Sequence, residues 1–132
     1  MKSPCYCAVL RAASRKTTAL YDAALAPAGL TLAQYSLMRR IERAGSPSLT
    51  ELGRLAELDR STVGRNVRLL AKLGLADLRE AEDQREAAVS LTAVGRAALD
   101  AAKPLWSGAQ RDIERKLGPE AAKALLVLAA AL

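Results

Sequence analysis

The sequence of 132 residues contains no histidine and no phenylalanine, and only one tryptophan and three tyrosines. Without histidine the chain has no imidazole for acid–base catalysis, for a Ser-His-Asp triad or for the usual imidazole metal sites. With so few aromatic side chains, leucine and alanine must fill the core, which is typical of packed helices. Apolar residues make up 51% of the chain and charged residues 26%, as in ordinary globular domains. These absences count against an enzyme, and we expect no metal or cofactor.

Long apolar runs are also missing. The run Cys5–Leu10 is too short for an export signal, and Ala124–Leu132 falls far short of the roughly 20 residues that a membrane-spanning helix needs. The sequence therefore predicts a cytoplasmic protein without a membrane partner. In that compartment we expect the thiols of Cys5 and Cys7 to be reduced.

Positive charge exceeds negative charge, since Lys and Arg total 20, Asp and Glu total 14, and the net charge is +6. A basic protein attracts polyanions such as nucleic acid, although net charge alone identifies no site. The local pattern is more specific, because residues 60–76 hold Arg60, Arg65, Arg68 and Lys72 and no acidic residue. This segment is the first candidate for contact with a polyanion.

Apolar periodicity and capping residues predict a mainly helical chain with about six helices and one two-stranded hairpin. Thr31 and Gln34 have the form of a capping box, Asp59 and Thr92 are N-cap residues, and Gly74 ends a helix. The expected helices cover residues 7–26, 31–44, a short segment capped by Ser48 or Thr50, 60–73, 92–117 and 119–132. The expected strands cover residues 75–78 and 87–91, with a polar hairpin tip between them.

A short helix, a tight turn, a second helix and a two-stranded ribbon together make a winged helix-turn-helix, in which the second helix enters the major groove of DNA. At 100° per residue, Val63, Val67 and Leu70 point to one side, which we expect to be buried. The candidates for DNA contact are polar side chains elsewhere on this helix: Arg60, Ser61, Thr62, Arg65, Asn66, Arg68 and Lys72. Arginine pairs with guanine, and hydroxyl groups bond to bases or phosphates. Arg85, at the hairpin tip, suits a narrow minor groove.

This segment resembles the DNA-binding core of the MarR family of regulators. The resemblance rests on Leu49–Leu52, Leu58–Val63, Leu70 and Gly74-Leu75, and on a wing pattern formed by Asp83-Gln84-Arg85, Leu91-Thr92 and Gly95. It covers nearly the whole chain and implies a homodimer, built from the first and last helices, that represses genes by binding a palindromic operator in double-stranded DNA. It also implies operator contacts by Ser61, Thr62, Arg65 and Arg68, and minor-groove insertion of Arg85, which Asp83 supports.

The resemblance divides the chain into three parts. Residues 1–46 are N-terminal helices for dimerisation and support, residues 47–92 are the winged helix-turn-helix lobe, and residues 93–132 are C-terminal dimerisation helices. Gly64 departs from ordinary helix composition, because glycine in a helix interior is unfavourable relative to alanine. It permits a close approach either of DNA or of a neighbouring helix.

The pair Cys5 and Cys7 stands at the start of the first expected helix, and its spacing suits a disulfide, a soft metal or a dimer core. Residues 7–15 resemble the organic-hydroperoxide-sensing branch of the same family, in which a reactive cysteine stands eight residues before an arginine. That resemblance implies that Tyr21 bonds the reactive thiol of the partner chain and that Tyr35 is a nearby aromatic. Arg11, Arg15 or the helix N-terminus would favour the thiolate of Cys7.

Two means of control follow from these residues. In the first, an oxidant converts Cys7 to a sulfenic acid that Cys5 resolves, and the protein leaves DNA. In the second, a small aromatic or phenolic ligand occupies a pocket between the dimerisation helices and the DNA-binding lobe, lined by Tyr21, Tyr35 and Trp106. A helical interaction module that does not bind DNA is the alternative to both.

Overall fold

The computed structural model describes residues 2–79 and 87–132. Its elements in chain order are α1 (Tyr6–Leu25), the 3-10 turn η1 (Ala26–Ala28), α2 (Leu32–Ala44), α3 (Leu49–Ala56), α4 (Arg60–Lys72), β1 (Ala76–Arg79), β2 (Ala88–Leu91), α5 (Ala93–Leu117) and α6 (Pro119–Ala131). The predicted mainly helical winged fold is confirmed. None of the helices within the described ranges is long and apolar enough to cross a membrane.

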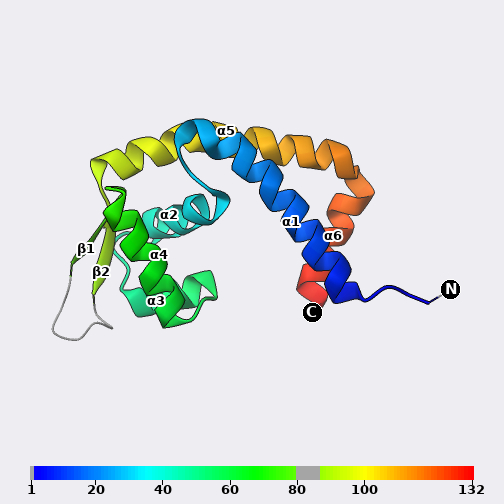
Figure 1. Cartoon of the computed structure of the whole chain (residues 1–132), viewed down its shortest axis with the longest axis horizontal. Coiled ribbons are helices and arrows are strands. Elements are labelled where there is room, and N and C mark those ends of the chain that lie inside the picture. Colours follow the sequence, from blue (N-terminus) through cyan, green and yellow to red (C-terminus); the bar gives the residue numbers. More distant parts are fainter. Residues whose placement is uncertain (1, 80–86) are drawn as a thin grey trace.

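Helix α5 connects the two ends of the molecule (Figure 1). At one end lie α2, α3, α4 and the antiparallel pair of β1 and β2, whose register runs from Ala76 opposite Leu91 to Arg79 opposite Ala88. At the other end lie α6 and the first turns of α1, together with both chain termini. Helix α1 packs against α5 along its path. The winged lobe therefore lies at one end of α5, and α6 with the first turns of α1 lies at the other.

Side-chain caps fix where the helices begin. Thr31 and Gln34 form the predicted capping box: the Gln34 amide donates to Thr31 Oγ1 at 3.2 Å, and the Thr31 amide donates to Gln34 Oε1 at 3.0 Å. Ser48, and not Thr50, caps α3 by accepting from the Glu51 amide at 3.0 Å. Asp59 and Thr92 cap α4 and α5 as predicted. These bonds satisfy amide groups that the first helical turn leaves without partners.

The strands begin one residue later than the sequence predicts. Gly74 has a φ of 77°, which closes the end of α4, and the Leu75 amide still donates to the Leu70 carbonyl at 2.9 Å. Leu75 therefore belongs to the helix closure rather than to β1. On the other strand, the Ala87 carbonyl accepts from the Leu49 amide at 3.0 Å, which ties the start of β2 to α3.

The core lies inside the DNA-binding lobe and along α5. Val63, Val67 and Leu70 on α4 are fully buried or nearly so, which confirms the predicted inward face. They share one cluster with side chains from α1, α2, α3, β2 and α5, among them Leu25, Met38, Ile41, Leu52, Val89 and Leu99. Because this cluster spans both flanking segments, the lobe does not form a core separate from α5.

Candidate nucleic-acid interface

Helix α4 presents its polar side chains to solvent because its apolar face is held by the core. Arg60, Ser61, Arg65, Arg68 and Lys72 are exposed, while Thr62 and Asn66 are half-buried. Helix α4 contains no acidic residue. The exposed part of α4 therefore carries a dense positive charge with hydroxyl and amide groups beside it, which is what contact with DNA backbone and base edges requires.

The first turn of α4 is fixed by Asp59. Its Oδ1 atom accepts from the Thr62 amide at 2.7 Å and from the Ser61 hydroxyl at 3.0 Å. Hydrogen bonds from Thr62, and then from Ser61, hold the pKa of the Asp59 carboxyl below its usual range. The Arg65 guanidinium in turn donates to Thr62 Oγ1 at 3.4 Å. The side chains at the leading end of α4 are thus oriented before any partner binds.

The tip of the wing is not part of the described structure. Strand β1 is described to Arg79 and the chain resumes at Ala87, so Asp83 and Arg85 lie outside the described residues. Insertion of Arg85 into a minor groove and its support by Asp83 stay predictions.

Cys5 and Cys7 lie at the start of α1, close to Arg11 but far from Tyr21 on the same helix. Cys5 is the N-cap residue and Cys7 the second residue of the helix, and both are exposed free thiols. Arg11 and Arg15 are exposed on the following turns. Tyr21 is fourteen residues beyond Cys7, or about 21 Å along the helix at 1.5 Å per residue. Within one chain Cys7 and Tyr21 are therefore not brought together.

Tyr21 and Tyr35 instead meet at Trp106. The Tyr21 ring stacks on Trp106 with centroids 6.2 Å apart, and the Tyr35 ring does so at 6.0 Å. The Tyr21 hydroxyl also donates to Oε1 of Gln110. Burial, and then the charge of Glu114, raises the pKa of Tyr21. This aromatic stack joins α1, α2 and α5.

A cleft of about 590 Å³ adjoins this stack between α2, α3 and α5. Tyr35 and Trp106 form an aromatic part of its wall, and the rest is lined by Ser36, Arg39, Arg40, Arg43, Ala44, Glu51 and Leu55. Arg40 is held in place, since its Nε donates to the Leu55 carbonyl at 3.1 Å. The three arginines were not predicted as site residues. Their spacing on α2 is that of an ordinary solvated helix face, and only the packing of α3 and α5 encloses them.

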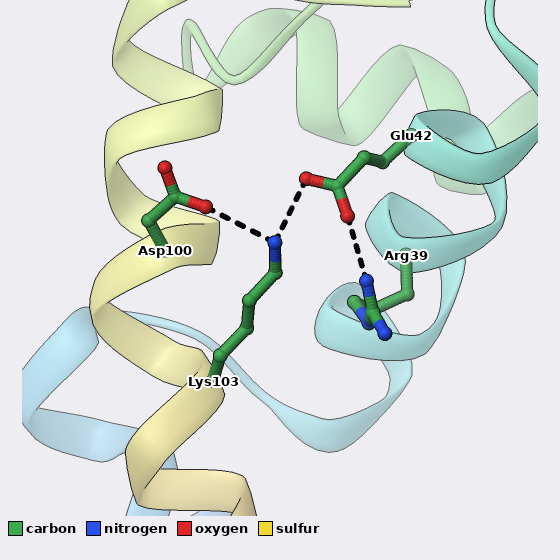
Figure 2. A network of polar contacts seen from close by, with 4 residues as sticks. All are labelled: Arg39, Glu42, Asp100 and Lys103. Atoms are coloured by element: carbon green, nitrogen blue, oxygen red, sulfur yellow. Dashed lines mark hydrogen bonds and ion pairs between the residues drawn. The ribbon is translucent and has the colours of Figure 1, made fainter.

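An ion-pair network beside the cleft links α2 to α5 (Figure 2). Lys103 Nζ lies 3.0 Å from Glu42 Oε2 and 3.1 Å from Asp100 Oδ1, and Arg39 Nη1 lies 2.6 Å from Glu42 Oε1. The hydrogen bond from Lys103 lowers the pKa of Glu42, and the bond to Glu42 raises the pKa of Lys103. The Glu42–Lys103 pair is therefore charged at neutral pH. Its contribution to stability is lost as the pH falls through the lowered pKa of Glu42 and as the pH rises through the raised pKa of Lys103.

No group of three or more metal-binding side chains is found in the ranges 2–79 and 87–132. The polar constellation on α4, the two thiols and the basic cleft are thus the features available for function in the described part of the chain.

Comparisons with known proteins point to one family. A sequence model of the MarR family matches residues 28–86. The transcriptional regulator MosR of M. tuberculosis, solved in complex with DNA, is 34% identical, with a TM-score of 0.82 over 97% of this chain and 96% of that one. A probable transcriptional regulator from Pseudomonas aeruginosa is 30% identical, with a TM-score of 0.81 over 93% and 92% of the two chains. No curated protein sequence matches the chain.

Proposed function

The chain belongs to the MarR family of winged-helix transcriptional regulators, and on that premise we propose that it binds a palindromic operator in double-stranded DNA as a homodimer and represses transcription. The exposed face of α4 carries this proposal, because it holds four basic side chains and no acidic one. MosR, with 34% sequence identity, has been solved with DNA bound. The regulator acts in the cytoplasm, where its operator DNA is accessible and its thiols are kept reduced.

In this proposal α4 enters the major groove with its leading turns against the bases. Ser61, Thr62 and Arg65 lie there, and the Asp59 cap holds them in a fixed orientation. Arg60, Asn66, Arg68 and Lys72 contact the flanking backbone, and Arg85 on the wing enters the adjacent minor groove. The two α4 helices of the dimer read two half-sites about one helical turn apart.

Arg65→Ala tests the assignment of base contact. If Arg65 contacts a guanine, the variant should bind the operator about 10- to 100-fold more weakly, equivalent to roughly 1–3 kcal/mol, and should lose discrimination at one base pair. Affinities for the operator and for single-base variants are measured by fluorescence anisotropy. The matched control is Arg111→Ala, an exposed arginine in the second half of α5. Equal effects of the two substitutions would remove Arg65 from the base-reading set.

We propose further that oxidation of Cys7 controls DNA binding. Support comes from its place as the second residue of α1 and from its exposure as a free thiol. The thiolate attacks an oxygen of an organic hydroperoxide and breaks the O–O bond. The sulfur becomes a sulfenic acid, and the leaving alkoxide takes a proton to become an alcohol. A Cys5 thiol, from the same or the partner subunit, then forms a disulfide and releases water.

Cys7→Ser separates sensing from DNA binding. Because Cys7 is far from α4, the variant should bind operator DNA within about twofold of the wild type and should no longer be released by stoichiometric hydroperoxide. Cys5→Ser is the matched control, which should still be oxidised but should stop at the sulfenic acid, visible as a gain of one oxygen by mass spectrometry. Release of Cys7→Ser by the oxidant would show that the sensor is elsewhere.

The basic cleft supports a second means of control. A small aromatic or phenolic ligand with an anionic group fits a site in which Tyr35 and Trp106 supply a ring-stacking wall and Arg40 and Arg43 supply positive charge. Since Trp106 is the only tryptophan, its fluorescence reports occupancy directly. This alternative would be favoured if salicylate quenched the Trp106 fluorescence and released the protein from DNA, while hydroperoxide did not change DNA binding.

A further inference from the structure

Gly64 lies on α4 beneath the side chain of Arg68. A Cβ atom built on Gly64 would lie 3.1 Å from Arg68 Nη1 and 3.9 Å from Arg68 Cζ, with no other side chain or neighbouring backbone within 4 Å. Gly64 is buried although the surrounding surface of α4 is exposed. The Nη1 end of the Arg68 guanidinium therefore lies over the one position of this helix that has no side chain.

This packing moves the charge of Arg68 toward the leading end of the helix. Side chains in an α-helix lean toward its N-terminus, and one turn of the helix is about 5.4 Å long. Arg68 follows Gly64 by four residues, so its guanidinium lies about one turn nearer the start of α4 than its own Cα. Arg68 thereby joins Arg60 and Ser61 around a hollow of about 370 Å³, which Leu49 and Gly64 complete.

The lining of this hollow suits a phosphate group. It brings together the guanidinium groups of Arg60 and Arg68, and no carboxylate is among the side chains that line it, while the Ser61 hydroxyl donates to Asp59. Arginine recognises phosphate through paired N–H donors, and the missing Cβ of Gly64 leaves room for a close approach to the helix. Glycine is the least favourable residue in a helix interior after proline, so its presence here calls for a reason beyond helix formation.

We propose that Gly64 is a positioning residue for DNA binding. Its missing side chain lets Arg68 lie along α4 with the guanidinium in the hollow, where Arg68 and Arg60 hold one backbone phosphate of the operator. This inference rests on the proposed function. An alanine at this position displaces the Arg68 guanidinium by a few tenths of an ångström, because its Cβ would lie 3.1 Å from Arg68 Nη1.

The test is a double-mutant cycle of Gly64→Ala and Arg68→Ala on an operator duplex selected by the wild-type protein. Gly64→Ala should weaken binding about three- to tenfold and reduce the magnitude of the slope of log affinity against log salt by about 1.8, the value for one lost phosphate contact in each subunit of the dimer. In the Arg68→Ala background, Gly64→Ala should have no further effect. The melting temperature of the single variant Gly64→Ala should equal or exceed that of the wild type, because alanine is more favourable than glycine in a helix.

Gly108→Ala is the matched control, since Gly108 is also a helical glycine and a Cβ there meets nothing within 4 Å. It should change neither the affinity nor the salt slope. The positioning role would be overturned if Gly64→Ala kept the wild-type affinity and salt slope, or if the affinity losses of the two substitutions added up in the double mutant. Either result would leave the proposed function intact. Absence of salt-dependent DNA binding by the wild type would overturn both this inference and the proposed function.

Discussion

Gly95→Ala is expected to lower the melting temperature by about 10 °C or more. A Cβ on Gly95 would lie 1.9 Å from the Leu75 carbonyl oxygen and 2.8 Å from the Leu75 carbonyl carbon, so backbone would have to move. That backbone is held, because the Thr92 hydroxyl donates to the Gly74 carbonyl at 2.6 Å and the Thr92 amide donates to the Leu75 carbonyl at 3.1 Å. A clash of this kind destabilises by about 3 kcal/mol or more, since neither partner is a flexible side chain.

Thermal unfolding followed by circular dichroism measures this effect, at one protein concentration for all variants because the expected dimer makes unfolding depend on concentration. Gly108→Ala in the same helix is the control, and it should be neutral or stabilising by up to about 1 kcal/mol. A melting temperature of Gly95→Ala equal to that of Gly108→Ala would contradict the close docking of α5 on the segment between α4 and β1.

Leu126→Glu is expected to produce a monomer and to weaken operator binding by about 10²–10⁴-fold, the gain that two linked sites provide over one. Helix α6 buries no residue within one chain, and Leu126 on it is 73% exposed. Its neighbours Leu125, Val127 and Leu128 are exposed as well, as are Tyr6, Val9, Leu10 and Leu20 on α1. Exposed apolar side chains in this number mark an interface, and in this family a second copy of the chain is the proposed partner.

Light scattering after size-exclusion chromatography gives the oligomeric state, and anisotropy on the operator gives the affinity. The control is Val94→Glu, because Val94 is 64% exposed but lies in the first turn of α5, at the opposite end of the molecule from α6. Val94→Glu should stay dimeric. Dimeric Leu126→Glu with unchanged operator affinity would show that α6 is not part of the dimer interface.

Much of the fold follows from local signals in the sequence. Asp59, Thr92 and the Thr31–Gln34 box are read as caps because their partners lie only three residues away. The inward face of α4 follows from helical periodicity in the same way. The predicted DNA-binding face of α4 is exposed as expected, and the contacts assigned to its residues stay predictions.

Contacts between distant segments could not be predicted. Glu42 and Lys103 are 61 residues apart, and nothing local marks either as a partner of the other. The sequence grouped Tyr21, Tyr35 and Trp106 in one pocket, but it did not predict that both tyrosines stack on Trp106 or that only Tyr35 and Trp106 line the cleft. Gly95 matched a family wing pattern in the sequence. The reason this position needs a glycine is the close approach of the Leu75 carbonyl, which only the packed structure shows.

Gly64 illustrates the same limit within the site. The sequence left open whether this glycine allows approach by DNA or by a neighbouring helix. In the structure its nearest neighbour is the Arg68 side chain of its own helix, a contact that depends on one arginine rotamer. The arginines of the cleft were missed for a related reason, since α3 and α5 enclose them only after packing.

The central claim is that the exposed face of α4 binds DNA, and one titration tests it most directly. The reduced wild-type protein is titrated by fluorescence anisotropy on the DNA upstream of its own gene, at several salt concentrations. The account predicts tight, sequence-selective binding whose affinity falls steeply with salt, with a log–log slope of about −5 or steeper for a dimer with at least six phosphate contacts. Binding that is absent at low salt, or that is insensitive to salt and to sequence, would contradict it.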